Sequence, residues 1–257
     1  MPILGEPEGS EPFLLGTGWF LQLGAIWFLV TAEHVLRKLY PEDSDPTSTR
    51  NTWDIIVPGL DDQPIHLSGS TTMTPGRYDV DAEASTMSRG YDVGIVRLHN
   101  PKLVYDRWKP VRRMTFVPEE DFDHGCYFVA GWPEALSFPM RGGIATQRYQ
   151  LLAPFARDQP FDRDIDIRLS LDRNDHSTLK GEPVAAPALA GMSGAPIWRV
   201  FKNGSSRYKP ELAGILTAVG DGGDTWIIYG TRSGVLRNLV ERETPGLYAA
   251  SEKLILR

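Results

Sequence analysis

Short apolar runs separated by turn-forming residues dominate this chain. The runs are rich in β-branched and aromatic residues, and clusters of Gly, Pro, Asn and Asp divide them. Strands give short or alternating apolar runs, whereas helices give apolar positions at every third or fourth residue, and sustained helical periodicity is nearly absent here. The pattern therefore predicts an all-β protein, built as a sandwich or a barrel.

The clearest unit is a hairpin, in which the apolar runs 18–23 and 26–31 flank Gly24-Ala25. Two strands joined by a tight turn give this pattern. Further strands are predicted at 54–57, 65–67, 91–98, 126–131, 164–171, 212–219 and 225–229. In the strand 164–171, apolar residues alternate with polar ones, which predicts one buried and one exposed face: Ile165, Ile167, Leu169 and Leu171 against Asp166, Arg168 and Ser170.

Helix is expected in two places only. Residues 32–36 are long enough for one turn, and 233–243 has Ser233 as a candidate N-cap and Pro245 just beyond its end. Polar residues fill 40–51 and 68–90, which we expect to be loops. Asp221-Gly222-Gly223-Asp224 has oxygen ligands suited to calcium, but a hairpin turn is the better interpretation.

Composition indicates a folded protein and excludes several partners. The chain has 257 residues, of which 41% are hydrophobic and 23% charged, far from the composition of disordered proteins. Its net charge of -6 gives no overall attraction to nucleic acid or to anionic lipid, so neither nucleic acid nor membrane is expected as a partner.

The only cysteine, Cys126, cannot form an internal disulfide, which favours a reducing, cytoplasmic location and a buried, structural thiol. The apolar stretch 13–30 does not have the features of a signal peptide or a membrane span. Acidic Glu6, Glu8 and Glu11 precede it where a signal peptide needs positive charge, and Gly and Gln interrupt it.

Three segments have the residues needed for nucleophilic catalysis, in the order histidine, aspartate, serine. His34 follows the hairpin, Asp92 stands at the start of the apolar run 91–98, and Ser193 lies in a glycine-rich turn. A serine hydroxyl needs a base within hydrogen-bond reach, and the base needs an acid to fix its tautomer. Gly191 and Gly194 allow backbone conformations in which amides near Ser193 stabilise a developing oxyanion.

These segments resemble the trypsin/chymotrypsin-like serine proteases: Gly16-Thr17-Gly18-Trp19-Phe20, Leu29-Val30-Thr31-Ala32-Glu33-His34, Tyr91-Asp92-Val93-Gly94-Ile95-Val96-Arg97-Leu98 and Gly191-Met192-Ser193-Gly194-Ala195-Pro196. The resemblance covers about residues 13–243. It implies two antiparallel six-stranded β-barrels with the site between them, and a short C-terminal helix. The first barrel would be 13–118 and the second, with the helix, 119–243, leaving 1–12 as an N-terminal extension and 244–257 as a tail.

The same resemblance implies a role for each matching residue. His34 would be the general base and then acid, Asp92 its orienting carboxylate, and Ser193 the nucleophile, with the amides of Gly191 and Ser193 as the oxyanion hole. Residues 214–217 resemble the family's strand after the nucleophile, whose far end lines the bound substrate. The substrate-binding residues would then be Pro187, Thr217, Ala218 and Val219, which favour a small or medium uncharged residue before the scissile bond.

Met192 departs from the family pattern. Digestive and clotting members have an aspartate there that pairs with a newly cut N-terminus, so we expect control by a partner or by the substrate instead. The function predicted is a serine endopeptidase acting on proteins or peptides, gated in this way; the alternative is a catalytically silent module of the same fold that binds peptides or serves as a scaffold. Neither a metal nor an organic cofactor is expected, since the remaining histidines lack zinc-ligand spacing. Glu33, beside His34, is expected to be a solvated charge at a turn; the alternative is that it biases the local pKa or a partner contact.

Overall fold

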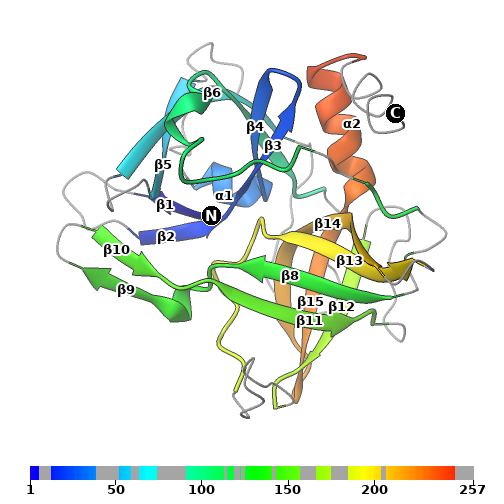
Figure 1. Ribbon diagram of the computed structural model, residues 1–257. Helices are drawn as coiled ribbons and strands as arrows, with labels where there is room; N and C mark the ends of the chain where they lie inside the picture. The colour runs from blue at the N-terminus through cyan, green and yellow to red at the C-terminus, as the bar shows by residue number, and fades with distance from the viewer. Residues whose placement is uncertain are drawn as a thin grey trace.

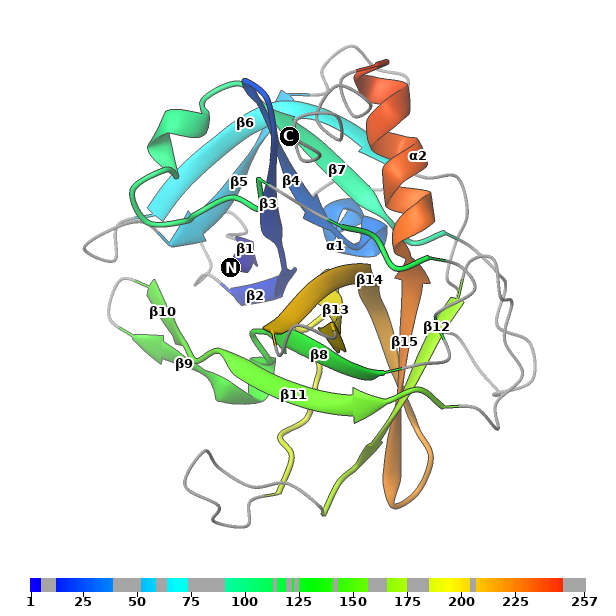
Figure 2. The same cartoon turned by 45° about the vertical axis from the view of Figure 1, so that its right-hand side comes forward.

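Strands form most of the protein, in two large antiparallel sheets and a small hairpin (Figure 1). The two large sheets have seven and six strands, and the six-stranded sheet is strongly curled (Figure 2). The computed structural model describes residues 1–5, 13–38, 52–58, 64–73, 91–112, 115–118, 122, 125–140, 143–156, 166–174, 185–203 and 207–246. The prediction of a mostly β protein is confirmed.

The seven-stranded sheet has the strand order β2-β1-β5-β6-β7-β4-β3. Its strands are β1 (Pro2–Gly5), β2 (Phe13–Thr17), β3 (Trp19–Leu23), β4 (Ile26–Thr31), β5 (Thr52–Pro58), β6 (Pro64–Met73) and β7 (Gly94–Leu98). The predicted hairpin is β3 and β4, paired from Trp19 with Val30 to Leu23 with Ile26. Apolar side chains of this sheet and of α1 (Glu33–Arg37) form one core, which includes Leu29, Val35 and Val96.

The six-stranded sheet has the order β11-β8-β13-β14-β15-β12. Its strands are β8 (Cys126–Gly131), β11 (Tyr149–Pro154), β12 (Asp166–Asp172), β13 (Pro196–Asn203), β14 (Arg207–Asp221) and β15 (Thr225–Arg232), and a separate hairpin joins β9 (Ser137–Met140) to β10 (Gly143–Thr146). The chain beyond β11 reaches the opposite edge strand, where Ala156 N donates to Arg168 O at 2.8 Å. The two edges of the curled sheet thus meet at this point.

Alternation along β12 agrees with the prediction from its sequence except at Asp166, which was assigned to the exposed face but is buried; Ile165 lies outside the described residues. Ile167, Leu169 and Leu171 are buried in the core of the six-stranded sheet, while Arg168 and Ser170 on the other face are partly exposed. Residues two apart share a face of a strand, so the apolar set packs together and the polar set does not.

A third apolar cluster joins the two sheets. It contains side chains of β3, β4 and β7, and also Leu212 and Ile215 of β14 with the buried face of the helix α2 (Ser233–Glu243). Trp19 and Trp198 contact across this junction, with ring centroids 6.4 Å apart. Burial of a shared apolar surface is the main force that can hold two sheets together, so this cluster fixes how the halves pack.

The prediction placed the bounds of α2 correctly but its cap wrongly. Arg232, not Ser233, is the N-cap residue, with an extended backbone and no side-chain hydrogen bond to the first turn. The Ser233 side chain is buried, and its hydroxyl has no partner among the described residues. The cap position was misplaced because β15 continues straight into the helix.

Other differences occur where the apolar signal is weak. Polar residues 68–73 were assigned to a loop, but they belong to β6, where pairing with β5 and β7 satisfies their backbone. Residues 2–5, assigned to an extension, form β1 between β2 and β5. Cys126 is exposed, because the thiol stands on the outer face at the end of β8; the prediction of a buried cysteine was wrong.

No helix in the described parts of the chain has both the length and the apolar character needed to cross a membrane.

Candidate active site

His34 and Asp92 come together from two segments that adjoin strands of the seven-stranded sheet. His34 is the second residue of α1, the short helix that follows β4, and Asp92 lies two residues before β7. His34 Nδ1 and Asp92 Oδ2 are 2.6 Å apart, and the His34 backbone N–H donates to Asp92 Oδ1 at 2.9 Å. One carboxylate therefore holds both the ring and the backbone of the histidine.

This pairing prepares His34 to act as a base through its other nitrogen. Asp92 is 1% exposed and the His34 side chain 35% exposed, so the acid is buried behind the ring. A carboxylate at Nδ1 keeps a proton on that nitrogen and leaves Nε2 as the acceptor.

Gly94 allows the close contact between α1 and β7 on which the pair depends. A Cβ at this position would lie 2.4 Å from Leu36 Cδ1 of α1. Asp92 was expected at the start of the strand, but β7 begins only at Gly94, and Asp92 lies in the preceding irregular segment. Its side chain is thus free of the alternation of the strand and can turn towards α1.

Ser193 lies in a tight turn before β13 that contains two residues with left-handed backbone conformations. Gly191 has φ of 88° and Gly194 has φ of 91°, values that favour glycine. A Cβ at Gly194 would lie 2.1 Å from both Thr17 O and Thr31 Oγ1, so the turn is pressed against β2 and β4. The glycines are therefore required both for the turn and for its contact with the seven-stranded sheet.

Among the described residues, the Ser193 hydroxyl makes its hydrogen bond to a carbonyl and not to His34. Ser193 Oγ donates to Thr217 O of β14 at 3.2 Å, and within the described residues no hydrogen bond joins it to His34. The structure brings His34 and Asp92 together and holds the serine on the neighbouring sheet, bonded to a carbonyl.

Within the described residues, alternate amides of the turn have no acceptor. The N–H groups of Met192, Gly194 and Ala195 donate to backbone carbonyls, but within the described chain those of Gly191 and Ser193 donate to none. The preceding carbonyls fix their directions: Ala190 O accepts from Glu134 N at 2.7 Å, and Met192 O accepts from Ala195 N at 2.9 Å. In a trans peptide the N–H points away from the carbonyl, so both amides have set orientations and can bind an anion.

Thr17, whose role the sequence did not reveal, connects this turn to two other segments. Its N–H donates to Ser193 O at 2.8 Å, and its hydroxyl donates to Gly191 O at 3.0 Å and accepts from Trp132 N at 3.0 Å. Its own carbonyl accepts from Thr31 Oγ1 at 2.7 Å. Thr17 is fully buried. The only sequence signal for this role is a hydroxyl side chain between Gly16 and Gly18, in the segment 16–20 that resembles the serine proteases.

Glu33, expected to be solvated, is 2% exposed and pairs with Arg37 one turn along α1. Burial raises the pKa of the Glu33 carboxyl, the Arg37 guanidinium opposes that rise, and the nearby Asp92 charge adds to it. The prediction of a solvated Glu33 was wrong because α1 turns the side of the helix that carries Glu33 towards the core. Arg37, four residues later in the helix, supplies the opposite charge that makes this burial tolerable.

The four proposed substrate-binding residues occupy different places. Thr217 is buried at an irregularity of β14, and it is the one that hydrogen-bonds Ser193 within the described chain. Ala218 pairs with Tyr229 of β15, and Val219 packs against the core of the six-stranded sheet. Pro187 is half-buried in the segment that leads to the turn.

The described residues contain no group of three or more His, Cys, Asp or Glu side chains placed to hold a metal ion. His66 and His99 lie apart from the site, and His124 and His176 lie outside the described residues. Residues 221–224 form the turn between β14 and β15, in which Asp221 Oδ1 accepts from Gly223 N at 2.9 Å.

Neither a scan against protein-family models nor a search of curated proteins finds a match to this chain.

Proposed function

We propose that this protein is a serine endopeptidase that hydrolyses peptide bonds through an acyl-enzyme on Ser193. The observation that carries the proposal is the double hydrogen bond between His34 and Asp92, residues 58 positions apart in the sequence. A buried carboxylate that fixes both the ring and the backbone of a half-exposed histidine is the arrangement that prepares a general base. The resemblance to the trypsin/chymotrypsin-like family remains part of this proposal.

In the proposed mechanism, His34 Nε2 takes the proton of the Ser193 hydroxyl as Oγ bonds to the carbonyl carbon of the scissile peptide. The carbonyl oxygen becomes an oxyanion, bound by the amides of Gly191 and Ser193. The C–N bond breaks as His34 gives its proton to the leaving amine, and the acyl group stays on Oγ. Water then attacks the ester with His34 as base, which releases the acid and restores the serine.

The position of Ser193 supports the view that this enzyme is gated by its substrate or by a partner. Its hydroxyl is bonded to Thr217 O, and it must rotate towards His34 before proton transfer. A substrate backbone that hydrogen-bonds to the Thr217 carbonyl would release the Ser193 hydroxyl. Binding and activation would thus be one event.

The two sheets fit the double-barrel architecture that the resemblance implies. We propose that each sheet corresponds to one barrel, with His34 and Asp92 on the first and Ser193 on the second. The first sheet has seven strands, one more than the six expected, and it includes β1, inserted between β2 and β5. A cytoplasmic location and protein or peptide substrates belong to the same proposal.

One observation favours a second function, a catalytically silent module that binds peptides in the same site. In the described structure the Ser193 hydroxyl bonds to a carbonyl rather than to a base, as in a protein that does not use it. The two functions differ in one property, the reactivity of Ser193.

A fluorophosphonate probe, followed by intact-mass measurement, tests that property directly. We expect one adduct on the wild-type protein, and none on Ser193→Ala or His34→Ala. Matched controls are Ser170→Ala, on the partly exposed face of β12, and His99→Ala, an exposed histidine, and both should label as the wild type does. Labelling that survives Ser193→Ala, or its absence with every candidate substrate and partner added, would overturn the peptidase and favour the silent module.

A further inference from the structure

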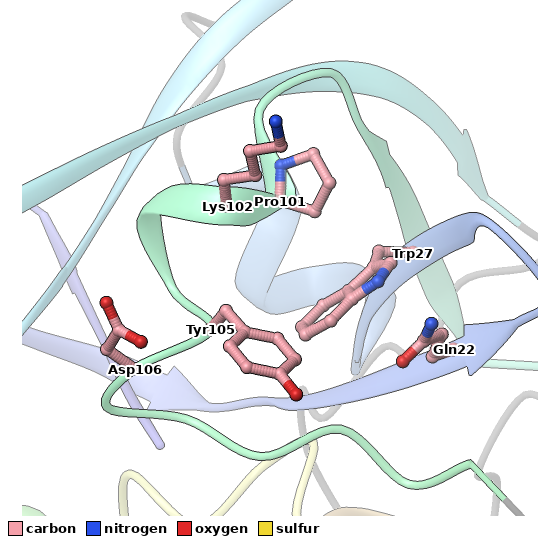
Figure 3. A pocket seen from close by; sticks show the side chains of 6 residues that line it. All are labelled: Gln22, Trp27, Pro101, Lys102, Tyr105 and Asp106. Carbon is pink, nitrogen blue, oxygen red and sulfur yellow. The ribbon is translucent and has the colours of Figure 1, made fainter.

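A hollow of about 240 Å³ lies on the seven-stranded sheet, at the hairpin end of β3 and β4 (Figure 3). Two of its lining residues, Gln22 and Trp27, face each other across these strands. The others follow β7, in and just after the short 3₁₀ helix Pro101–Leu103. The six lining residues are Gln22, Trp27, Pro101, Lys102, Tyr105 and Asp106.

The hollow is separate from the candidate active site. Trp27 is the second residue of β4, and His34 follows the other end of that strand. At about 3.3 Å per residue, the strand alone puts about 13 Å between Trp27 and Thr31, and α1 lies beyond Thr31. A molecule bound in the hollow would therefore not occupy the cleavage site.

Aromatic rings form the apolar part of the hollow. The rings of Trp27 and Tyr105 have centroids 5.9 Å apart and a tilt of 56°, and Figure 3 shows them side by side with Pro101 above. Trp27 is 5% exposed, whereas Tyr105 is 41% exposed. An exposed ring beside a buried one forms a surface suited to one inserted apolar side chain, above all an aromatic one.

Cations surround this aromatic surface and are held in place. Lys109 Nζ lies 4.5 Å from the centroid of the Tyr105 ring and donates to Tyr105 O at 2.9 Å. Arg112 donates through Nη2 to the Tyr105 hydroxyl at 3.1 Å and through Nε to Gln22 Oε1 at 2.9 Å. The Arg112 guanidinium also lowers the pKa of the Tyr105 hydroxyl, as expected where positive charge is concentrated.

These cations have no acidic partner in the described part of the chain. Lys102, Lys109 and Arg112 are exposed, and none makes an ion pair with a described carboxylate. Residues 101–112 include four basic side chains and one acidic, in a chain with a net charge of -6. The hollow thus forms a positive spot on an acidic protein, and complementary charge would speed and orient the binding of an acidic partner.

We propose that this hollow docks an acidic segment of another protein, which inserts one aromatic side chain against Tyr105 and places carboxylates on Lys102, Lys109 and Arg112. The mixed character of the surface favours a peptide over a nucleic acid. A polyanion would need a longer basic track than these cations provide. The proposal does not depend on hydrolysis.

Direct binding to the Ser193→Ala protein tests the docking site without any turnover. The probe is a fluorescent random copolymer of glutamate and tyrosine, measured by anisotropy beside polyglutamate and a single-stranded oligonucleotide. We expect the copolymer to bind at least about tenfold more tightly than either comparison ligand. The variants Tyr105→Ala and Lys109→Glu/Arg112→Glu should each weaken copolymer binding by about tenfold or more.

Arg242→Glu, a charge reversal at an exposed residue of α2, is the matched control and should bind as the parent protein does. Unchanged thermal unfolding in every variant would show that the fold is intact. Equal binding of polyglutamate would leave only a nonspecific charge effect, and tighter binding of the oligonucleotide would indicate a nucleic-acid site. Either result, or copolymer binding that the Tyr105 and Lys109/Arg112 variants leave unchanged, would overturn the proposal.

Discussion

Replacing Thr17 by valine removes a hydroxyl that serves two backbone groups of the candidate site. The Thr17 hydroxyl donates to Gly191 O and accepts from Trp132 N, and valine has a similar shape without either function. A polar group left buried without a partner costs about 1–3 kcal/mol. With two such groups, and with Gly191 half-exposed to water, we expect unfolding to become easier by about 2–4 kcal/mol.

The same change should slow the reaction of Ser193. The Thr17 hydroxyl holds the carbonyl of Gly191, and without it the position of Gly191 is less well fixed, although its N–H is still present. Complete loss of one oxyanion donor costs about 10²–10³ in rate, which sets the upper limit of the effect. Thr17→Ser keeps the hydroxyl and loses one buried methyl group, about 1 kcal/mol, so its labelling rate should stay close to that of the wild type.

Urea unfolding measures the first effect and the rate of fluorophosphonate labelling the second. A Thr17→Val protein that labels at the wild-type rate would refute the positioning role. A loss of stability below about 1 kcal/mol would refute the assignment of its two hydrogen bonds. The unfolding result stands whether or not Ser193 reacts, so the two readouts separate an error about Thr17 from an error about the function.

Three further predictions concern buried charges. Asp92→Asn should lower peptide hydrolysis by about 10⁴-fold by favouring the wrong tautomer of His34, with little change in substrate affinity, which steady-state kinetics would show. Glu211→Ala should cost about 3–5 kcal/mol in urea unfolding, since it removes the carboxylate that pairs with the buried Arg199 guanidinium at 2.5 Å, and the double change Arg199→Met/Glu211→Leu should recover most of that loss. The pKa of Glu33 is raised above its ordinary value of 4.5, so the folded state holds this proton more tightly than the unfolded state, and ionisation destabilises the fold as pH rises. Glu33→Gln should therefore gain stability relative to the wild type as pH rises from about 4.5, and a constant difference across the urea series would contradict the assignment.

The sequence predicted those strands that have a strong local signal. In β12 and in the β3–β4 hairpin, apolar alternation or a glycine turn determines the element within a few residues. The strand β1 is short and the end of β6 is polar, and hydrogen bonds to the distant strands β5 and β7 stabilise them. Such pairings leave no periodic pattern in the local sequence.

The site shows the same division. His34, Asp92 and Ser193 could be named because the chemistry requires these residue types, and the structure places the first two in contact. The roles of Thr17 and the burial of Glu33 depend on which segments pack together, so a list of residue types does not contain them. The bond of Ser193 to Thr217 is likewise a choice between rotamers, set by geometry alone.

The bond from Thr17 to Gly191 joins residues 174 positions apart, which has a consequence for how this protein folds. Closing so long a loop is entropically costly, and chains rich in such distant contacts fold slowly. The seven-stranded sheet can begin to assemble from nearer neighbours, but the turn at Ser193 can be fixed only after the later sheet has formed and docked. During refolding, reactivity of Ser193 should therefore lag behind the gain of β structure, and the nascent chain should pass most of its synthesis with this site unassembled.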